Sequence, residues 1–290
     1  MVIKEDATGF AAFQAKQVDL DNASLAYPAY QQVKSAYPSG NYYRYMQPQG
    51  YHLHFSQVRN GPLNDVRVRR ALALSVDRDE LNKTVAGNEG EWAVTAAMQG
   101  LFTQEETRRI MKQDVNEAKR LLAEAGYANG LTLEWPIEDN TAQVNLTWFQ
   151  LIQAQTKRAG INVELKAMDK NDQRAKRRRG DFDIEVVQSL GLLEANADSM
   201  MFGIYHSKES TNWPKNNHPE LDKILEAQRR EADPAKRRDI QRQAAQRAAD
   251  QAWGVELIYP PKWYISQPYV KNYYPHFSVY QDHTMAWLDR

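Results

Sequence analysis

The chain has 290 residues, and its 37 lysines and arginines balance 37 aspartates and glutamates, so the formal net charge is zero. It lacks the basic excess by which nucleic-acid-binding proteins are usually recognised, and we expect no nucleic-acid partner. No apolar run approaches the roughly 20 residues that span a bilayer, and the absence of cysteine excludes disulfides, thiolate metal ligands and a cysteine nucleophile.

Short helices and candidate strands alternate over the first 55 residues. We predict the end of a strand at residues 2–3, helices at residues 7–16 and 27–36, and strands at residues 43–46 and 51–55. His52 and His54 alternate on the last strand, so they share one face, as two metal ligands would. Two histidines leave a metal site incomplete, and we favour a strand-face pair without a metal.

Residues 64–81 predict two helices joined at a corner. Asn64 or Asp65 can cap the first helix, because a short side-chain oxygen accepts from the free N–H groups of the first turn. Asp77 and Glu80 form a second capping pair that starts the next helix. The buried stripe of the first helix consists of Val68, Ala71, Leu72, Ser75 and Val76.

Helix and strand patterns then alternate with short links. The expected elements are helices at residues 114–125, 141–159 and 171–179 and strands at residues 131–135, 161–165 and 182–186. This order is typical of βαβ units, so the sequence predicts a parallel sheet with right-handed crossovers and an α/β fold class.

The remainder of the chain begins with a long stretch, Gly191–Pro219, that we predict to be irregular; such loops are usually functional or disordered. Helices are expected at residues 220–231 and 233–252, and a buried strand at residues 255–259 that Pro260 and Pro261 break. We predict that the aromatic tail to Arg290 forms strands or loops laid back on the N-terminal part.

Several of these segments resemble the family 5 extracellular solute-binding proteins, which are the dipeptide, oligopeptide and nickel receptors of bacterial ABC importers. The matching segments are residues 62–72 with 76–78, and residues 14–20, 118–127, 219–222, 233–237 and 258–261. Lys16 stands where the family has glycine. Residue 1 corresponds to about the middle of a family member, so we expect a C-terminal portion, and the missing signal peptide follows from that truncation.

The resemblance implies a two-lobed periplasmic-binding-protein-like fold with the second lobe complete and the first only partial. We expect residues 49–260 to form the second lobe and residues 1–48 and 261–290 to belong to the first, with hinge connections near residues 51–55 and 258–261. A ligand that bridges both lobes stabilises a closed form, which the importer recognises. The implied protein is periplasmic or extracellular, binds a peptide or similar small solute, partners a membrane permease, needs no cofactor and is not an enzyme.

Ligands of open parallel sheets lie beyond the C-terminal ends of the strands. In peptide-binding relatives the segment after the third strand supplies backbone groups, a tryptophan, and an aspartate that holds the peptide's amino terminus. That tryptophan and aspartate are missing here, and Glu194 is the nearest carboxylate able to replace the aspartate. The predicted ligand-binding residues are Trp135, Gln188, Ser189, Leu190, Gly191, Glu194 and Trp213.

Two alternative functions remain open. One is an α/β enzyme that uses the same crevice, for which we find no G-x-S-x-G, H-E-x-x-H, P-loop or G-x-G-x-x-G motif. The other is a metal or haem receptor of the same family, which rests on the histidines alone. We interpret the basic run Arg174–Arg179 as a solvated helix face, and we predict that Asp183 faces solvent or a neighbouring helix.

Overall fold

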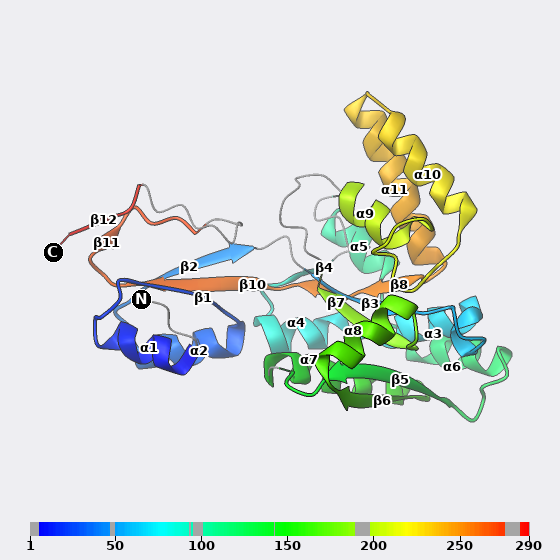
Figure 1. The fold of residues 1–290 in the computed structure, drawn as a ribbon, viewed down its shortest axis with the longest axis horizontal. Helices are drawn as coiled ribbons and strands as arrows, with labels where there is room; N and C mark the ends of the chain where they lie inside the picture. Colours follow the sequence, from blue (N-terminus) through cyan, green and yellow to red (C-terminus); the bar gives the residue numbers. More distant parts are fainter. Residues whose placement is uncertain are drawn as a thin grey trace.

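The computed structural model describes residues 6–46, 50–92, 94, 101–141, 143–188, 198–275 and 285–289. Figure 1 shows an elongated molecule with a smaller and a larger part joined near the middle of its length. The elements of the smaller part are α1 (Asp6–Gln14), β1 (Leu20–Leu25), α2 (Tyr27–Ala36), β2 (Asn41–Met46), β10 (Pro261–Ser266), β11 (Val270–Lys271) and β12 (Trp287–Leu288).

The smaller part is built on an antiparallel sheet in which β10 lies between β1 and β2. Helices α1 and α2 cover one face of this sheet (Figure 1). The ring of Tyr30 stacks on Trp263 with 4.7 Å between ring centroids, and Phe13 and Ile265 are fully buried in the same cluster. A strand that follows residue 260 is therefore the centre of a sheet whose other strands precede residue 47.

The larger part contains the remaining elements. They are β3 (Tyr51–Phe55), η1 (Pro62–Asn64), α3 (Val66–Ser75), α4 (Arg78–Ala86), β4 (Glu91–Trp92), α5 (Gln104–Ile110), α6 (Val115–Glu124), β5 (Leu131–Glu138), α7 (Gln143–Arg158), β6 (Ile161–Met168), α8 (Lys170–Arg179), β7 (Ile184–Gln188), α9 (Asp198–Tyr205), α10 (Pro219–Arg230), α11 (Pro234–Asp250), β8 (Gly254–Glu256) and β9 (Ile258–Tyr259). One contiguous apolar core extends through this part from Leu53 to Ile258.

The predicted helix starts are confirmed where a capping side chain was recognised. The Asp65 carboxylate accepts from the Arg67 N–H at the start of α3, and the Asp77 carboxylate accepts from the Glu80 N–H at the start of α4. Asp233 likewise caps α11. Short-range hydrogen bonds of this kind can be inferred from sequence because both partners lie within one turn.

The predicted parallel sheet is correct for two of its three strands. β5 and β6 pair in parallel with Leu131 opposite Ile161, and α7 is the helix between them. The expectation that the third strand joins them is wrong, because β7 pairs antiparallel with β3, with Leu53 opposite Val186. β3 lies between β7 and β8, and these three strands form a separate antiparallel sheet.

Five elements were not predicted, namely β1, η1, β4, α5 and α9. β1 and α5 escaped notice, although Thr103 and Glu106 form a reciprocal capping box at the start of α5. α9 lies inside the stretch that we predicted to be irregular, and it buries Met201, Phe202 and Tyr205. The predicted strand end at residues 2–3 lies outside the described residues.

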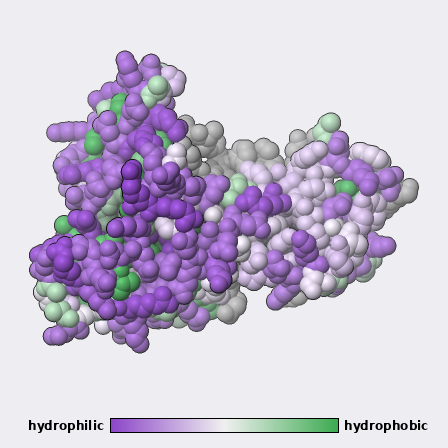
Figure 2. All heavy atoms as spheres, turned by 180° about the vertical axis from the view of Figure 1, so that it is seen from behind, coloured by the Kyte–Doolittle hydropathy of each residue, from purple (hydrophilic) through white to green (hydrophobic). Residues whose placement is uncertain are grey.

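The two parts also touch beside their covalent connections. Gly87, with φ +60°, ends α4 in the left-handed conformation, and a Cβ there would lie 2.2 Å from the Tyr27 ring of α2. Arg44 of β2 forms an ion pair of 2.7 Å with Glu89. Seen from behind, hydrophilic side chains cover most of the larger part, whereas the smaller part is paler, with intermediate hydropathy (Figure 2).

Candidate functional site

The candidate site is the end of the β7-β3-β8 sheet that lies nearest the smaller part (Figure 1). Tyr51, the first residue of β3, pairs with Gln188, the last residue of β7. Gly50 brings the chain into this strand, and a Cβ on it would lie 2.6 Å from the Glu256 carboxylate and 2.9 Å from the Tyr259 ring. Only glycine therefore fits here without displacing a buried neighbour.

One face of this sheet is polar although it is buried. His52 and His54 of β3 lie on it, with Glu256 of β8 opposite His52 and Glu185 of β7 opposite His54. All four side chains are at most 2% exposed, and the two imidazole centroids are 4.3 Å apart. The histidines thus share a strand face, as their spacing predicts.

Hydrogen bonding on this polar face is incomplete. The Glu185 carboxylate accepts from Gln173 at 2.8 Å and from Arg177, both on α8. Within the described part of the chain, neither ring nitrogen of either histidine has a hydrogen-bond partner, and neither does either carboxyl oxygen of Glu256. The shortest separation, 4.0 Å between His52 Nδ1 and Glu256 Oε2, is too long for a hydrogen bond.

Burial determines the charge of these groups. It lowers the pKa of His52 to about 3 and the pKa of His54 well below its ordinary value of 6.5, so both rings are neutral near pH 7. Burial also raises the pKa of Glu256 well above 4.5, and it raises the pKa of Glu185 to about 7, against an opposing effect of Arg177. Both imidazoles are therefore neutral near pH 7 and burial favours the neutral form of Glu256, whereas Glu185, with a pKa of about 7, is partly ionised beside Arg177.

The predicted site residues that the structure describes lie in different surroundings. Trp135 is 0% exposed, and its ring packs on Phe149 of α7 with 4.7 Å between centroids. Trp213 is half-buried, and the Arg177 guanidinium lies 4.7 Å from the centre of its ring. The burial of Trp135 favours a packing role, because its ring presents no surface to a ligand.

The other predicted residues lie at the end of β7 or after it. Gln188 ends that strand, opposite Tyr51. Ser189, Leu190, Gly191 and Glu194 lie outside the described residues, so their assignment to a ligand site stays a prediction. The buried polar face was not predicted as a unit, although Glu185 and Glu256 each interrupt an apolar run, which is a usable signal.

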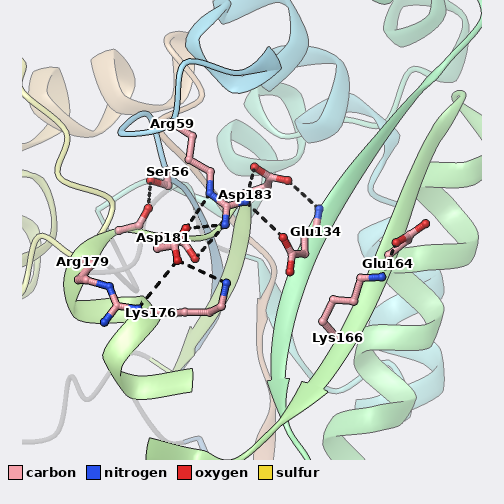
Figure 3. A network of polar contacts seen from close by, with 10 residues as sticks. Ser56, Arg59, Glu134, Glu164, Lys166, Lys176, Arg179, Asp181 and Asp183 are labelled. Carbon is pink, nitrogen blue, oxygen red and sulfur yellow. Dashed lines mark hydrogen bonds and ion pairs between the residues drawn. The ribbon is translucent and has the colours of Figure 1, made fainter. Parts of the chain in front are cut away.

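A network of charges stabilises the opposite end of the sheet (Figure 3). Arg59, just beyond β3, contacts Asp181 at 2.5 Å, Glu134 at 3.3 Å and Asp183 at 3.5 Å. The Asp183 carboxylate also accepts from the Glu134 N–H at 2.8 Å, which links β7 to β5. The expectation that Asp183 faces solvent or a helix is wrong, because its carboxylate faces Arg59 and β5. The alternation of residues along one strand does not show which cation another segment brings to it.

The described residues contain neither of two features that mark other classes of site. No group of three or more histidine, aspartate or glutamate side chains in them is arranged to hold a metal ion. None of the helices in the described ranges is long and apolar enough to cross a membrane.

Comparison with known proteins was made for sequence and structure. The family model described as bacterial extracellular solute-binding proteins, family 5 Middle, matches residues 1–212. The periplasmic murein peptide-binding protein MppA of Escherichia coli is 26% identical over 279 residues, which cover 93% of this chain and 51% of that protein. The periplasmic oligopeptide-binding protein OppA of Escherichia coli is 26% identical over 278 residues, with 93% and 50% covered.

A solved structure confirms the fold. The ABC transporter substrate-binding protein CtaP of Listeria monocytogenes superimposes with a TM-score of 0.86 at 20% identity, and the match covers 100% of this chain and 59% of that one. The α/β, two-lobed fold that the resemblance implied is therefore correct. This chain spans about half the length of the curated relatives that it matches.

Proposed function

We propose that this chain, which belongs to the family 5 bacterial extracellular solute-binding proteins, is part of the extracytoplasmic substrate-binding component of an ABC importer. The observation that carries the proposal is the family match over residues 1–212. Two matched relatives are peptide-binding proteins by name, so we propose a peptide or a similar small solute as the ligand. The partner is the membrane permease of the importer.

The proposed mechanism is closure of two lobes around the ligand. We place the lobe boundaries at residues 49 and 260, because the apolar clusters separate there. Leu53 and Ile258 belong to the larger core, whereas Trp263 and Ile265 belong to the cluster of α1 and α2. The connections are the segment before Tyr51 and the single residue between β9 and β10. Hinges of this kind absorb a large change in backbone angles over few residues.

The proposed activity is binding without catalysis. Three ionisable groups of the candidate site are at most 2% exposed, namely His52, His54 and Glu256. A substrate does not reach groups that are buried in this way. A general acid or base must lie within hydrogen-bond reach of the proton that it transfers. Differential affinity of the ligand for the closed form is sufficient to signal occupancy to the permease.

Glu194 is the residue that we propose for recognition of a ligand amine. It follows β7 by six positions, and we propose that it takes the place of the aspartate that the family resemblance implies for peptide-binding relatives. A carboxylate that accepts a charge-assisted hydrogen bond from an amino terminus contributes about 1.5–3 kcal/mol where water is excluded. Glu194→Gln is therefore expected to weaken binding of a free-amine tripeptide about tenfold or more.

The experiment is a calorimetric titration of the protein expressed from its complete coding sequence, since the relatives are about twice as long as this chain. Trialanine and N-acetyl-trialanine are compared on the wild type and on Glu194→Gln. Selective loss for trialanine supports the assignment. Equal losses for both ligands remove Glu194 from the site, and failure of the wild type to bind any of a set of di- to pentapeptides contradicts the peptide proposal.

A further inference from the structure

A cavity lies in the larger part, away from the Tyr51–Gln188 end of the β7-β3-β8 sheet. It is bounded by α3, the segment that follows α5, the end of α11 and the start of β8, and its volume is about 210 Å³. Gly254 lines the cavity and pairs with His54. His54 lies three positions after Tyr51 on β3. At about 3.4 Å per residue, the cavity is displaced by roughly 10 Å along the strand from the Tyr51–Gln188 pair.

The cavity wall includes a buried cation, Arg78, one of whose N–H groups has no hydrogen-bond partner. Arg78 is 1% exposed; its Nε donates to the Glu256 carbonyl at 2.8 Å and its Nη1 to the Met111 carbonyl at 2.7 Å. Its Nη2 is buried without a hydrogen-bond partner. The guanidinium lies 5.8 Å from the centre of the Trp92 ring, and Glu256 and Asp77 act on its charge only from beyond hydrogen-bond distance. Burial lowers the pKa of Arg78 to about 10, which reflects the cost of holding this charge away from water.

Two further cations line the same cavity. Arg70 of α3 and Lys112 are exposed at its mouth, and neither makes a hydrogen bond or ion pair within the described part of the chain. The one carboxylate of the lining, Asp250, accepts from Gln246 at 2.8 Å. The lining therefore holds three positive groups and one negative group, and outside the lining the Glu117 carboxylate feels the charges of Arg70 and Lys112.

The rest of the wall is apolar. The residues of this kind are Ala73, Leu74, Ile110, Met111 and Ala249. A volume of about 210 Å³ equals that of roughly seven waters at ~30 Å³ each, so the cavity can hold a molecule of that size. Apolar walls disfavour a strongly hydrated ion such as phosphate, and Asp250 disfavours a multiply charged anion.

We propose that this cavity binds a small organic monoanion, a carboxylate with a short apolar tail, at a site separate from the proposed solute cleft. The carboxylate lies between Arg70 and Lys112 and compensates the charge of Arg78, while the tail contacts Leu74 and Ile110. This assignment rests on the cationic and apolar lining and on the Arg78 Nη2 that has no hydrogen-bond partner, and it holds whether or not the chain serves an importer.

Butyrate is the probe, and butyramide is its uncharged counterpart of nearly the same shape. Calorimetry measures binding to the 290-residue chain, and the NMR signal of the Arg78 Nε–H, assigned by its loss in Arg78→Lys, reports on the site. Arg70→Gln with Lys112→Gln removes the two exposed cations without breaking a hydrogen bond or ion pair of the described residues. Lys119→Gln removes an exposed cation of α6 that does not line the cavity, and serves as the matched control.

The expected result is saturable binding of one butyrate per chain with a shift of the Arg78 signal. The double variant should bind at least tenfold more weakly, and Lys119→Gln should bind like the wild type. Butyramide should give no saturable shift. Absence of saturable butyrate binding, equal binding of butyramide, or an undiminished affinity of the double variant would each overturn the proposal.

Discussion

Replacement of Glu256 by glutamine tests whether the buried sheet face holds a neutral carboxyl. Glu256 is 2% exposed on β8, and neither of its oxygens has a hydrogen-bond partner among the described residues. Burial raises its pKa well above 4.5, and the positive charge of Arg78 opposes that effect only in part. Glutamine has nearly the same shape and cannot ionise, so it should fit the same space.

The expected change in the free energy of unfolding follows from the linkage between folding and proton binding. Above pH 4.5 the unfolded chain releases the proton of Glu256, whereas the folded protein keeps it until the pH reaches the raised pKa. The folded state then binds more protons, so the free energy of unfolding falls as pH rises, by about 1.4 kcal/mol per pH unit for this group. The free energy of unfolding of Glu256→Gln does not fall in this way, because glutamine does not ionise. Relative to the wild type, the variant should gain stability as the pH rises above 4.5, by up to about 1.4 kcal/mol per pH unit, until the pH reaches the raised pKa of Glu256.

The assay is urea-induced unfolding of both proteins at half-unit pH steps, followed by tryptophan fluorescence. His52, His54 and Glu185 titrate in both proteins, so their contributions cancel in the difference between the two curves. Glu105→Gln replaces an exposed carboxyl of α5 and should follow the wild type at every pH. Parallel curves for Glu256→Gln and the wild type would show that the carboxyl is already ionised in the fold, and would refute the reasoning.

Two further substitutions test the backbone. Lys16 has φ +55° in the turn that closes α1. Lys16→Gly should raise the free energy of unfolding by about 0.5–1 kcal/mol, because the penalty of ~1–2 kcal/mol for a left-handed lysine exceeds the entropy cost of glycine. A lowered urea midpoint would contradict this. Gly50→Ala should lower it by about 1–3 kcal/mol, since the added Cβ meets Glu256 and Tyr259. Gly61→Ala, whose Cβ meets nothing within 4 Å, should change it by less than about 0.5 kcal/mol, and equal effects of the two alanines would refute the steric argument.

Features that depend on neighbours in sequence were predictable. The α3, α4 and α11 starts follow from Asp65, Asp77 and Asp233, whose carboxylates accept from N–H groups two or three residues later. The backbone conformation of Lys16 is another such local feature. The family pattern has glycine there, and the structure shows the left-handed backbone that explains this preference.

Features that depend on distant partners were not predictable. An alternating strand shows which residues share a face but not which strand lies beside it. The pattern of β7 was therefore compatible with a parallel and with an antiparallel neighbour, and the structure shows an antiparallel one, with Val186 opposite Leu53. Trp135 shows the same limit, because its place near a strand end suggested a ligand, while Phe149 of α7 covers its ring. For the candidate site, Gln188 was located at its strand end, but the buried polar face was not recognised.

We propose above that the protein binds a peptide-like solute and leaves it unchanged. The most direct test is equilibrium dialysis of the protein, expressed from its complete coding sequence, against a defined pool of di- to pentapeptides, with mass spectrometry of the bound and free fractions. We predict saturable retention of one peptide per chain, released on unfolding with its mass unchanged. Cleaved or modified peptides, or no retention above that of the unfolded protein, would contradict the account.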